Sequence, residues 1–405
     1  MNNEIRDQKG SKTSILQTLR MKGSMSRIEL TRITGLSRAT ISTSIAELME
    51  YNLVYETDNR QTTGGRPATS LELVPYSNII IGVDFDHNLW TIGAFDLLGN
   101  VIKTITIPVN ASSPEMTFKV LSGEIKDFIK TLDRDPIPLL GIGVPGLVSE
   151  SHSIITSAAQ LNWYHIDVEK IMREEIGWPT VVLNRYRARG LTECRYGSGQ
   201  SFSNLAYIGV GTGVAAGLYI DRQLLSGSLG GAGEIGHFTI EPEGPLCPCG
   251  NQGCLQALCS GPVIEQEFRR LLRSGEKSVI YSDPSLDMQL LKTYDICAVA
   301  DQGDALAIKV VNQAAAYLGI AMANLVNLFN PEAIILGGAI PNSSRLFVET
   351  ATKIMKQRAM SSLSAATKVK TSSFKDIGGA LGAANFALDK NMSMTFFNNN
   401  GVGTS

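Results

Sequence analysis

Residues 244–256 read GPLCPCGNQGCLQ and place Cys247, Cys249 and Cys254 within eight positions of one another. A proline fixes the backbone between the first two cysteines, and the glycines allow a tight turn that can aim three sulfurs at one point. His237 stands ten residues before the first cysteine and is one of only four histidines in the chain. Three cysteines and one histidine form the closed ligand set that is typical of a structural zinc ion.

Two other interpretations of this stretch stay open. The cysteines can form a redox switch, although a Cys-Pro-Cys spacing strains an internal disulfide. They can also be small buried thiols, with His237 an unrelated core residue. A disulfide scaffold is disfavoured because six cysteines in 405 residues are too sparse. Three cysteines are isolated in the sequence and are expected in the core: Cys194, Cys259 and Cys297.

The composition is that of a globular protein with two or three domains, since 405 residues with 43% hydrophobic content can bury several cores. The first residues, MNNEIRDQKGSKTS, lack the pattern of a secretory signal, and no run of about 18 apolar residues is seen. We therefore expect a cytoplasmic protein. The net charge is −2, but residues 1–70 hold ten Lys/Arg against seven Asp/Glu, a local charge of +3. An anionic partner is expected to bind this front region.

The front region is predicted to contain a helix-turn-helix. Ser26 and Glu29 form a capping box, which predicts a helix that ends at Gly35. The apolar side chains of this helix that we expect to face inward are Ile28, Leu30 and Ile33. Ser37 caps a second helix, whose inward positions are predicted to be Ile41, Ile45 and Leu48. The outward positions of the second helix are then Arg38, Thr40, Thr43 and Ser44.

A wing is predicted after these helices, formed by strands over 53–57 and 70–74 with a Gly-Gly-Arg-Pro turn at 64–67. The second helix suits the DNA major groove, and Arg66 in the turn suits a narrow minor groove. The predicted DNA-binding residues are Ser37, Arg38, Thr40, Thr43, Ser44 and Arg66. One such DNA-binding domain, called the head below, contacts one half-site of an operator. A homodimer on double-stranded, pseudo-palindromic operator DNA is therefore expected. The alternative is that these helices serve only packing or dimer contacts and that the turn has no DNA role.

The rest of the chain is predicted to be a mixed α/β body with two lobes. Short apolar strands alternate with helical patterns, as in NIIIGVDF, LLGIGVPG, NLAYIGVGTG and AIILGGAI. We expect a DNA-binding domain over 1–75, a first lobe over 76–190 and a second lobe over 191–390, whose last helix can return to the first lobe. Residues 391–405 are polar and rich in Gly and Asn, and are expected to form a disordered tail.

The segments AGEIGH (232–237) and CPCGNQGCLQA (247–257) resemble the zinc signature of the ROK family of repressors, open reading frames and kinases. Together with the predicted head, the chain resembles ROK transcriptional repressors of the xylose-repressor and NagC/Mlc type. The resemblance implies an actin/hexokinase-like pair of α/β lobes with a sugar cleft between them. It also implies a structural zinc ion that is held by His237, Cys247, Cys249 and Cys254 and that orders the segment carrying sugar ligands.

The same comparison of motifs argues against a kinase. ROK kinases carry a D-x-G-G-T turn after the first strand, whereas residues 84–88 read DFDHN and lack both glycines. The resemblance also places a proton-accepting Asp after Asn184, and here that position is Arg185, which cannot accept a proton. We therefore predict a transcriptional regulator of carbohydrate genes, without transferase activity. The alternatives are a ROK sugar kinase that retains a DNA-binding domain and a scaffold without a ligand.

The resemblance implies that five residues contact the effector: Asn184, Arg185, Glu234, His237 and Gln256. Arg185 and Gln256 stand where relatives have acids, so the site loses negative charge and gains a cation. This exchange favours a sugar with an anionic group, such as a phosphate or an acid. The alternative is that Arg185 points away and that the site binds a neutral sugar or nothing. Gln160 also stands where relatives have Asn, which leaves the ligand's identity open.

Overall fold

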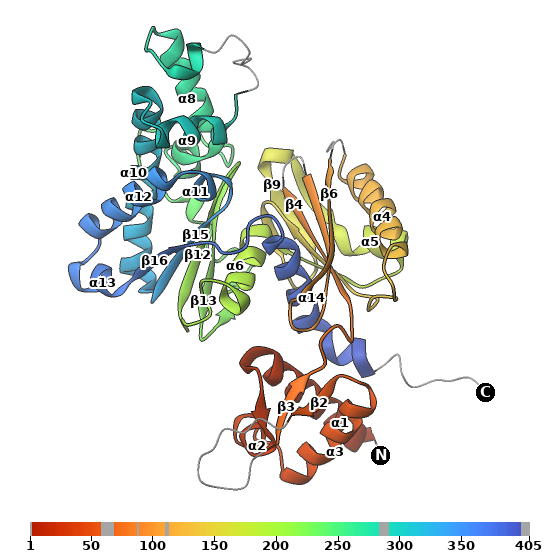
Figure 1. Ribbon diagram of the computed structural model, residues 1–405. Coiled ribbons are helices and arrows are strands. Elements are labelled where there is room, and N and C mark those ends of the chain that lie inside the picture. Colours follow the sequence, from red (N-terminus) through yellow and green to blue (C-terminus); the bar gives the residue numbers. More distant parts are fainter. Residues whose placement is uncertain (1, 58–68, 87–88, 110–112, 283–290, 398–405) are drawn as a thin grey trace. The chain divides into compact units, whose positions relative to one another are not determined.

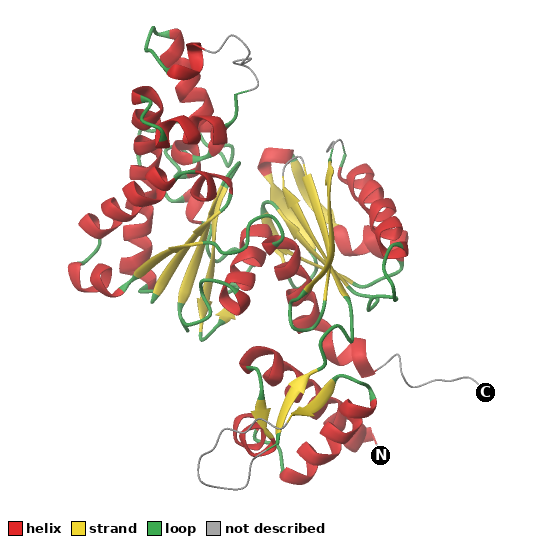
Figure 2. Ribbon diagram, in the orientation of Figure 1, coloured by secondary structure: helices red, strands yellow, loops and turns green. Residues whose placement is uncertain are grey.

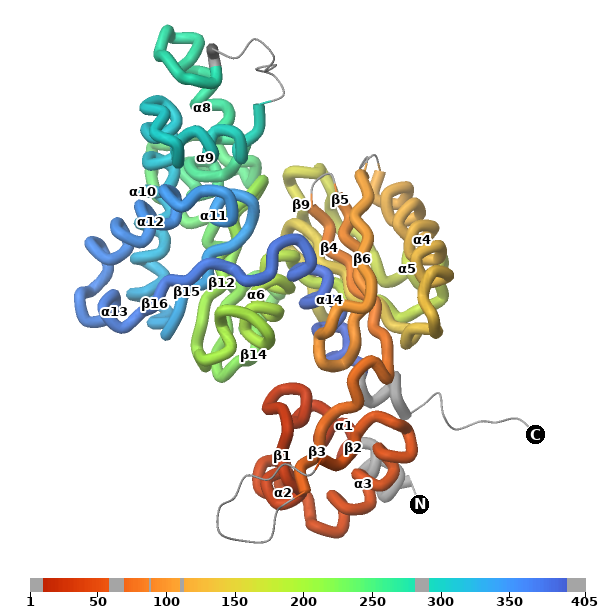
Figure 3. The backbone as a smooth tube through the Cα atoms, viewed as in Figure 1, coloured from red at the N-terminus to blue at the C-terminus, as the bar shows by residue number. Residues whose placement is uncertain are grey.

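The structure is a computed structural model that describes all residues except 1, 58–68, 87–88, 110–112, 283–290 and 398–405 (Figure 1). The chain forms two compact units. The first unit comprises residues 1–142, 168–182 and 383–405, and the second comprises 143–167 and 183–382. The backbone therefore passes between the units four times, and this path can be followed by colour in Figure 3.

The first unit begins with a small helical head. Its elements are α1 (Asn2–Lys22), β1 (Met25–Ser26), α2 (Arg27–Thr34), α3 (Arg38–Glu50), β2 (Val54–Thr57) and β3 (Ser70–Leu73). The long helix α1 supplies Ile15, Leu16 and Leu19 to the core of the head, where all three side chains are buried. β3 pairs with β2 as the wing prediction requires, but it also pairs with β1, so the sheet has three strands.

The caps of the helix-turn-helix are confirmed. Ser26 and Glu29 form a capping box, Gly35 ends α2 in the left-handed conformation, and Ser37 caps α3. Two of the inward predictions for α2 are wrong, because Ile28 is 69% exposed and Ile33 is 40% exposed. Residues two apart on a helix lie about 200° apart around its axis, so Ile28 cannot share a face with the buried Leu30.

One outward prediction for α3 is also wrong. Ser44 is only 4% exposed, although it was expected to face DNA. It lies three residues after Ile41 and four before Leu48, both of which are buried as predicted with Ile45. A residue at this spacing belongs to the apolar stripe of the helix, and a short hydroxyl side chain fits there. Arg66 and the turn at 64–67 lie outside the described residues.

The rest of the first unit is built on a five-stranded sheet with the order β11-β7-β4-β5-β6. Its strands are β4 (Ile80–Asp86), β5 (Leu89–Phe95), β6 (Val101–Pro108), β7 (Leu140–Val144) and β11 (Thr180–Asn184). The helices α4 (Pro114–Lys130) and α5 (Val168–Ile176) lie on one face of this sheet, and α14 (Gly378–Phe397) lies on the other (Figure 1). α14 continues to Phe397, so the expectation of a disordered tail from residue 391 is wrong for its first seven residues.

The second unit holds two sheets. The smaller has the order β10-β9-β8 and is made of β8 (Leu147–Ser149), β9 (Ile154–Ala158) and β10 (Trp163–Asp167). The larger has the order β14-β13-β12-β15-β16 and is made of β12 (Leu205–Val210), β13 (Val214–Ile220), β14 (Gln223–Leu224), β15 (Ala333–Gly337) and β16 (Lys368–Thr371). Both large sheets of the protein are flanked by helices, which confirms the mixed α/β class (Figure 2).

The helices of the second unit divide over the faces of its large sheet. α6 (Arg185–Tyr196) packs on one face, and α10 (Ala305–Phe329) and α12 (Arg345–Arg358) lie on the other (Figure 1). The remaining elements are η1 (Ala159–Leu161), η2 (Ile235–His237), α7 (Gln256–Cys259), α8 (Gly261–Arg273), η3 (Val279–Ser282), α9 (Thr293–Asp301), α11 (Ala339–Ser343) and α13 (Ser361–Ala366).

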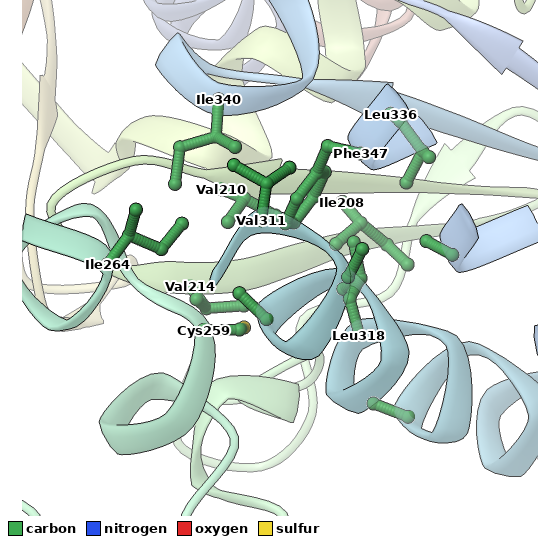
Figure 4. Packing of buried hydrophobic residues seen from close by; sticks show 14 of the residues in the cluster. Ile208, Val210, Val214, Cys259, Ile264, Val311, Leu318, Leu336, Ile340 and Phe347 are labelled. Atoms are coloured by element: carbon green, nitrogen blue, oxygen red, sulfur yellow. The ribbon is translucent and has the colours of Figure 1, made fainter. Parts of the chain in front are cut away.

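α10 is the centre of the hydrophobic core of this unit. Val311 and Leu318 of α10 lie against Ile208 and Leu336 of the sheet, with Phe347 of α12 beside them (Figure 4). By length and composition α10 could cross a membrane, but most of its apolar window is buried inside the protein. α10 is therefore a core helix. Cys194, Cys259 and Cys297 are buried free thiols, as predicted.

Two glycines allow α14 to approach its neighbours closely. A Cβ on Gly382 would lie 1.8 Å from the carbonyl oxygen of Ala188 in α6. A Cβ on Gly141 of β7 would lie 2.0 Å from the carbonyl oxygen of Ala383. Both obstacles are backbone atoms, so they cannot move aside as a flexible side chain can. The start of α14 is thereby held in contact with α6 in the second unit.

We expect Gly382→Ala to lower the free energy of unfolding by at least about 2 kcal/mol, because the added methyl group must push α14 away from α6. Gly123→Ala is the matched control, since Gly123 lies within α4 and a Cβ there meets nothing within 4 Å. The control should be neutral or stabilise the protein by up to about 1 kcal/mol. Urea unfolding followed by circular dichroism measures both variants, and equal stabilities would contradict the prediction.

Candidate functional site

The second unit contains a cavity of about 310 Å³. Its walls come from β8, β9 and η1, from the start of α6, from the turn between β12 and β13, and from the loop that carries the clustered cysteines. All five predicted effector residues line this cavity: Asn184, Arg185, Glu234, His237 and Gln256. Gln160, which stands where relatives have Asn, lines it as well.

Asn184 joins the start of α6 to the cavity wall. Its Oδ1 accepts hydrogen bonds from the backbone N–H groups of Tyr186 (2.9 Å) and Arg187 (3.4 Å), and so caps the helix. Its Nδ2 donates to the carbonyl oxygen of Gly146 at 2.9 Å. Arg185, the next residue, is 97% buried from solvent and lines the cavity.

Two glutamines form hydrogen bonds with the turn between β12 and β13, which lines the cavity. Oε1 of Gln256 accepts a hydrogen bond from the backbone N–H of Val214 at 3.2 Å. Nε2 of Gln160 donates to the carbonyl oxygen of Thr212 at 3.1 Å. The hydroxyl of Tyr186 donates to the carbonyl oxygen of Gly213 at 3.2 Å, and its ring faces the guanidinium of Arg185 at 5.1 Å. Tyr186 is a cavity residue that sequence analysis missed.

Arg187 and Glu150 form a buried ion pair beside the cavity. Nη1 of Arg187 lies 3.0 Å from Oε1 of Glu150, and the side chains are 1% and 5% exposed. The guanidinium also donates to the carbonyl oxygens of Gly230 and Leu225, while Glu150 accepts from the hydroxyl of Ser226. This pair therefore fixes the glycine-rich loop that leads to Glu234. Sequence analysis missed the pair, because its members are 37 positions apart.

Glu234 and His237 bring two titratable groups to the cavity. Burial raises the pKa of Glu234, and the nearby Arg187 opposes this effect. Burial also lowers the pKa of His237. Nε2 of His237 lies 3.9 Å from a carboxylate oxygen of Glu234, whereas Nδ1 faces the cysteine cluster. His237 therefore belongs both to the cavity wall and to the neighbouring cluster.

His237, Cys247, Cys249 and Cys254 form that cluster, and their ligand atoms all lie within 4.8 Å of one another. Sγ of Cys249 and Sγ of Cys254 are 3.7 Å apart, and Sγ of Cys247 is 3.8 Å from Nδ1 of His237. A tetrahedral ion with metal–sulfur bonds of about 2.3 Å requires sulfurs about 3.8 Å apart. The four residues therefore fit a metal ion, and all six cysteines are free thiols rather than disulfides.

The cysteine loop is held in shape by its surroundings. Short antiparallel bridges pair Thr239 with Cys254 and Leu246 with Gln252. Gly253 has φ 66°, and a Cβ there would lie 1.5 Å from the carbonyl oxygen of Glu241, so only glycine fits. Burial raises the pKa values of Cys247 and Cys254. Burial acts in the same direction on Cys249, but hydrogen bonds outweigh it and lower the pKa of that thiol.

The head presents a second candidate surface at the start of α3. Ser37, Arg38 and Thr43 are exposed, and Thr40 is half-buried. Oγ of Ser37 accepts a hydrogen bond from the backbone N–H of Thr40 at 3.1 Å, so this hydroxyl already caps the helix. Ser44 is buried and is not part of this surface.

The profile of the ROK family matches residues 80–390. The chain belongs to the ROK family. The xylose repressor of Bacillus subtilis strain 168 is 29% identical over 386 residues, covering 94% of this chain and 95% of the relative. NagC, a DNA-binding transcriptional dual regulator of Escherichia coli K12, is 30% identical over 370 residues, covering 91% and 89%. The family predicted from the cysteine signature is confirmed.

Solved structures of both ROK classes resemble this ROK protein. A ROK transcriptional regulator described as a homolog of Escherichia coli Mlc has a TM-score of 0.83 and 27% identity, covering 96% of this chain and 98% of its own. A ROK glucokinase of Streptomyces griseus, solved with glucose and AMPPNP, has a TM-score of 0.70 and 25% identity. It covers 99% of its own chain but only 76% of this one. The two-lobed ROK architecture is thus confirmed.

Gly209 of β12 and Gly337 of β15 make close packing possible in this ROK protein. A Cβ on Gly209 would lie 2.0 Å from the ring of Tyr186, and one on Gly337 would lie 2.2 Å from the hydroxyl of Tyr207. Both glycines thus make room for aromatic side chains. Asp84 is buried near the end of β4. Residues 87–88, which stand where ROK kinases have the D-x-G-G-T turn, lie outside the described residues.

We expect Arg187→Met to lower the free energy of unfolding by about 3–5 kcal/mol, because Glu150 would remain buried beside an apolar side chain. Arg270→Met is the control, since its pair with Glu267 is largely exposed and should contribute less than about 1 kcal/mol. Urea unfolding of the full chain compares them. The double variant Arg187→Met with Glu150→Leu should regain much of the lost free energy of unfolding. A double variant as unstable as Arg187→Met would show that the broken ion pair does not cause the loss.

Proposed function

We propose that this ROK protein is a DNA-binding transcriptional regulator that represses carbohydrate-metabolism genes and senses a sugar or sugar derivative in its cavity. The observation that carries the proposal is Arg185, a buried cation on the cavity wall directly after the cap of α6. In ROK kinases the acid at this position accepts the proton of the sugar hydroxyl, and a guanidinium cannot do so. The cavity therefore binds a ligand without phosphorylating it.

The curated relatives support this proposal, since a xylose repressor and NagC match more than 90% of the chain. Residues 1–75 form the DNA-binding domain, and 76–190 and 191–390 contribute the sensing body. The exposed start of α3 reads the major groove through Ser37, Arg38, Thr40 and Thr43, and Arg66 in the wing enters the minor groove. A cytoplasmic homodimer places two heads on two half-sites of double-stranded operator DNA.

The effector occupies the cavity that Asn184, Arg185, Glu234, His237 and Gln256 line. A guanidinium favours carboxylate or phosphate over hydroxyl groups, so a sugar acid or sugar phosphate suits this wall better than a neutral sugar does. Because a ligand shifts a conformational equilibrium by its differential affinity for the two states, binding of such an effector can change operator occupancy.

The metal in the cysteine cluster is zinc and is structural. A Cys₃His set leaves no open position for a reacting water, and the sulfur-rich ligands match the preference of zinc. Zinc would fix Cys249 and the neighbouring Pro248, both of which line the cavity. It would also leave Nε2 of His237 directed toward Glu234, in the way that carboxylates often orient metal-bound histidines.

DNA recognition is tested with the DNA upstream of the protein's own gene in a gel shift at several salt concentrations. The wild-type protein should shift this DNA. Arg38→Ala should weaken specific binding by about 1–3 kcal/mol, because a contact to bases or phosphates is lost. Arg345→Ala, a change of an exposed arginine in the second unit, is the control and should bind as the wild type does. Absence of any salt-dependent shift would refute the proposal.

The same preparation should leave nucleotide unchanged when it is given ATP with glucose, N-acetylglucosamine or xylose. Calorimetric titration with these sugars and with glucose 6-phosphate and gluconate then identifies the ligand class. Robust phosphorylation would favour the kinase alternative. Tight binding of a neutral sugar alone would contradict the anionic effector.

Zinc should be present at about one ion per chain in the purified protein, measured by elemental mass spectrometry. Cys254→Ser should lose most of this zinc, because Cys254 is a buried member of the cluster. Cys259→Ser is the matched control, since Cys259 is a buried free thiol only five residues away and outside the cluster. Equal zinc contents in the two variants would show that the cluster is not the metal site.

A further inference from the structure

The last turn of α1 is fixed by a buried arginine. The side chain of Arg20 is 2% exposed, and its Nη1 lies 2.8 Å from Oδ1 of Asp389. Nη2 donates to Oδ1 of Asn385 at 2.5 Å, and Nε donates to the carbonyl oxygen of Leu97 at 3.4 Å. Asn385 and Asp389 stand one turn apart on α14, so one guanidinium bridges successive turns of that helix.

A second attachment holds the segment that follows the head. The buried carboxylate of Asp96 accepts hydrogen bonds from the backbone N–H of Tyr76 at 3.0 Å and from that of Leu98 at 2.9 Å. The carbonyl oxygen of Tyr76 accepts a hydrogen bond from Arg134 at 2.8 Å. The head is therefore joined to the rest of the first unit both through its connecting segment and through α1.

α14 is shared by the two units. It begins in the second unit, where the hydroxyl of Thr192 in α6 donates to the carbonyl oxygen of Gly378 at 2.6 Å and Gly382 packs on Ala188. From Ala383 onward it belongs to the first unit, where Asn385 and Asp389 hold Arg20. α6 itself starts at the cavity wall. α6 thus carries both part of the cavity wall and the contact with the start of α14, and later residues of α14 hold Arg20.

We propose that Arg20 is the positioning residue that orients the DNA-reading head for its operator, by fixing α1 to the helix that both units share. The inference rests on the proposed function. Two half-sites can be read together only if each head is held in a defined orientation, and a head attached by its connecting segment alone could rotate. Lysine cannot replace Arg20, because a single ammonium does not reach two acceptors on successive turns in the way a planar guanidinium does.

The experiment uses the full-length protein and two DNA duplexes. One carries both half-sites of the upstream operator, and the other has one half-site scrambled. Arg20→Ala should weaken binding to the intact operator by at least about tenfold, and leave binding to the single half-site within about twofold. Arg20→Lys should resemble Arg20→Ala. A head that is merely destabilised would lose affinity for both duplexes equally. The ratio of the affinity for the intact operator to that for the single half-site therefore separates a positioning role from a loss of stability.

Lys12→Ala is the matched control, because Lys12 forms a partly buried ion pair with Glu47 entirely inside the head. Hydrogen exchange measured by mass spectrometry on both variants locates the loosened contacts. Arg20→Ala and Asp389→Ala should each speed exchange in residues 383–391 and at the end of α1, whereas Lys12→Ala should leave 383–391 as in the wild type.

Unchanged affinity for the intact operator in Arg20→Ala, or an equal loss on both duplexes, would overturn the proposal. Unchanged exchange in residues 383–391 would do the same. If the wild-type protein bound neither duplex, the proposed function would fail instead, and the exchange data would still decide whether Arg20 fixes α1 to α14.

Discussion

The structure of the sensing body depends on the burial of α6. Ten of its twelve residues are buried, and these include three arginines and a glutamate. Because a buried polar group without a partner costs free energy, several neighbouring segments must supply partners at fixed places. Glu193 accepts hydrogen bonds from the backbone N–H groups of Ser198, Ser373 and Phe374. Arg187 donates to the carbonyl oxygen of Leu225, in the loop before Glu234. The cavity wall is built from the same helix.

Local chemistry made much of the fold predictable. The caps at Ser26 and Ser37 and the end at Gly35 follow from side chains that interact within one turn, so they need no knowledge of the tertiary structure. The cysteine signature was equally local and led to the family. The wrong predictions in the head concern side-chain direction: Ile28 lies about 200° around its helix from the buried Leu30, and the spacing of Ser44 puts it on the apolar stripe of α3.

Other features depend on contacts between distant parts of the chain and could not be predicted. The pairing of Arg187 with Glu150 joins residues that are 37 positions apart, and the cation of Arg20 meets Asp389 across almost the whole sequence. β1 is too short to show a strand pattern and exists because β3 offers it a partner. That five residues would gather around one cavity was easier to predict, because they stand in motifs around short turns.

The contacts between α14 and Arg20 also predict how mutations in α14 affect regulation. The side-chain partners of Arg20, Asn385 and Asp389, come after the cysteine loop and the cavity residues in the sequence. A substitution at Asn385 or Asp389 would spare the cysteine loop and the cavity residues, yet would remove a contact that holds the amino-terminal head. Missense alleles at these two positions should therefore behave as regulatory mutations.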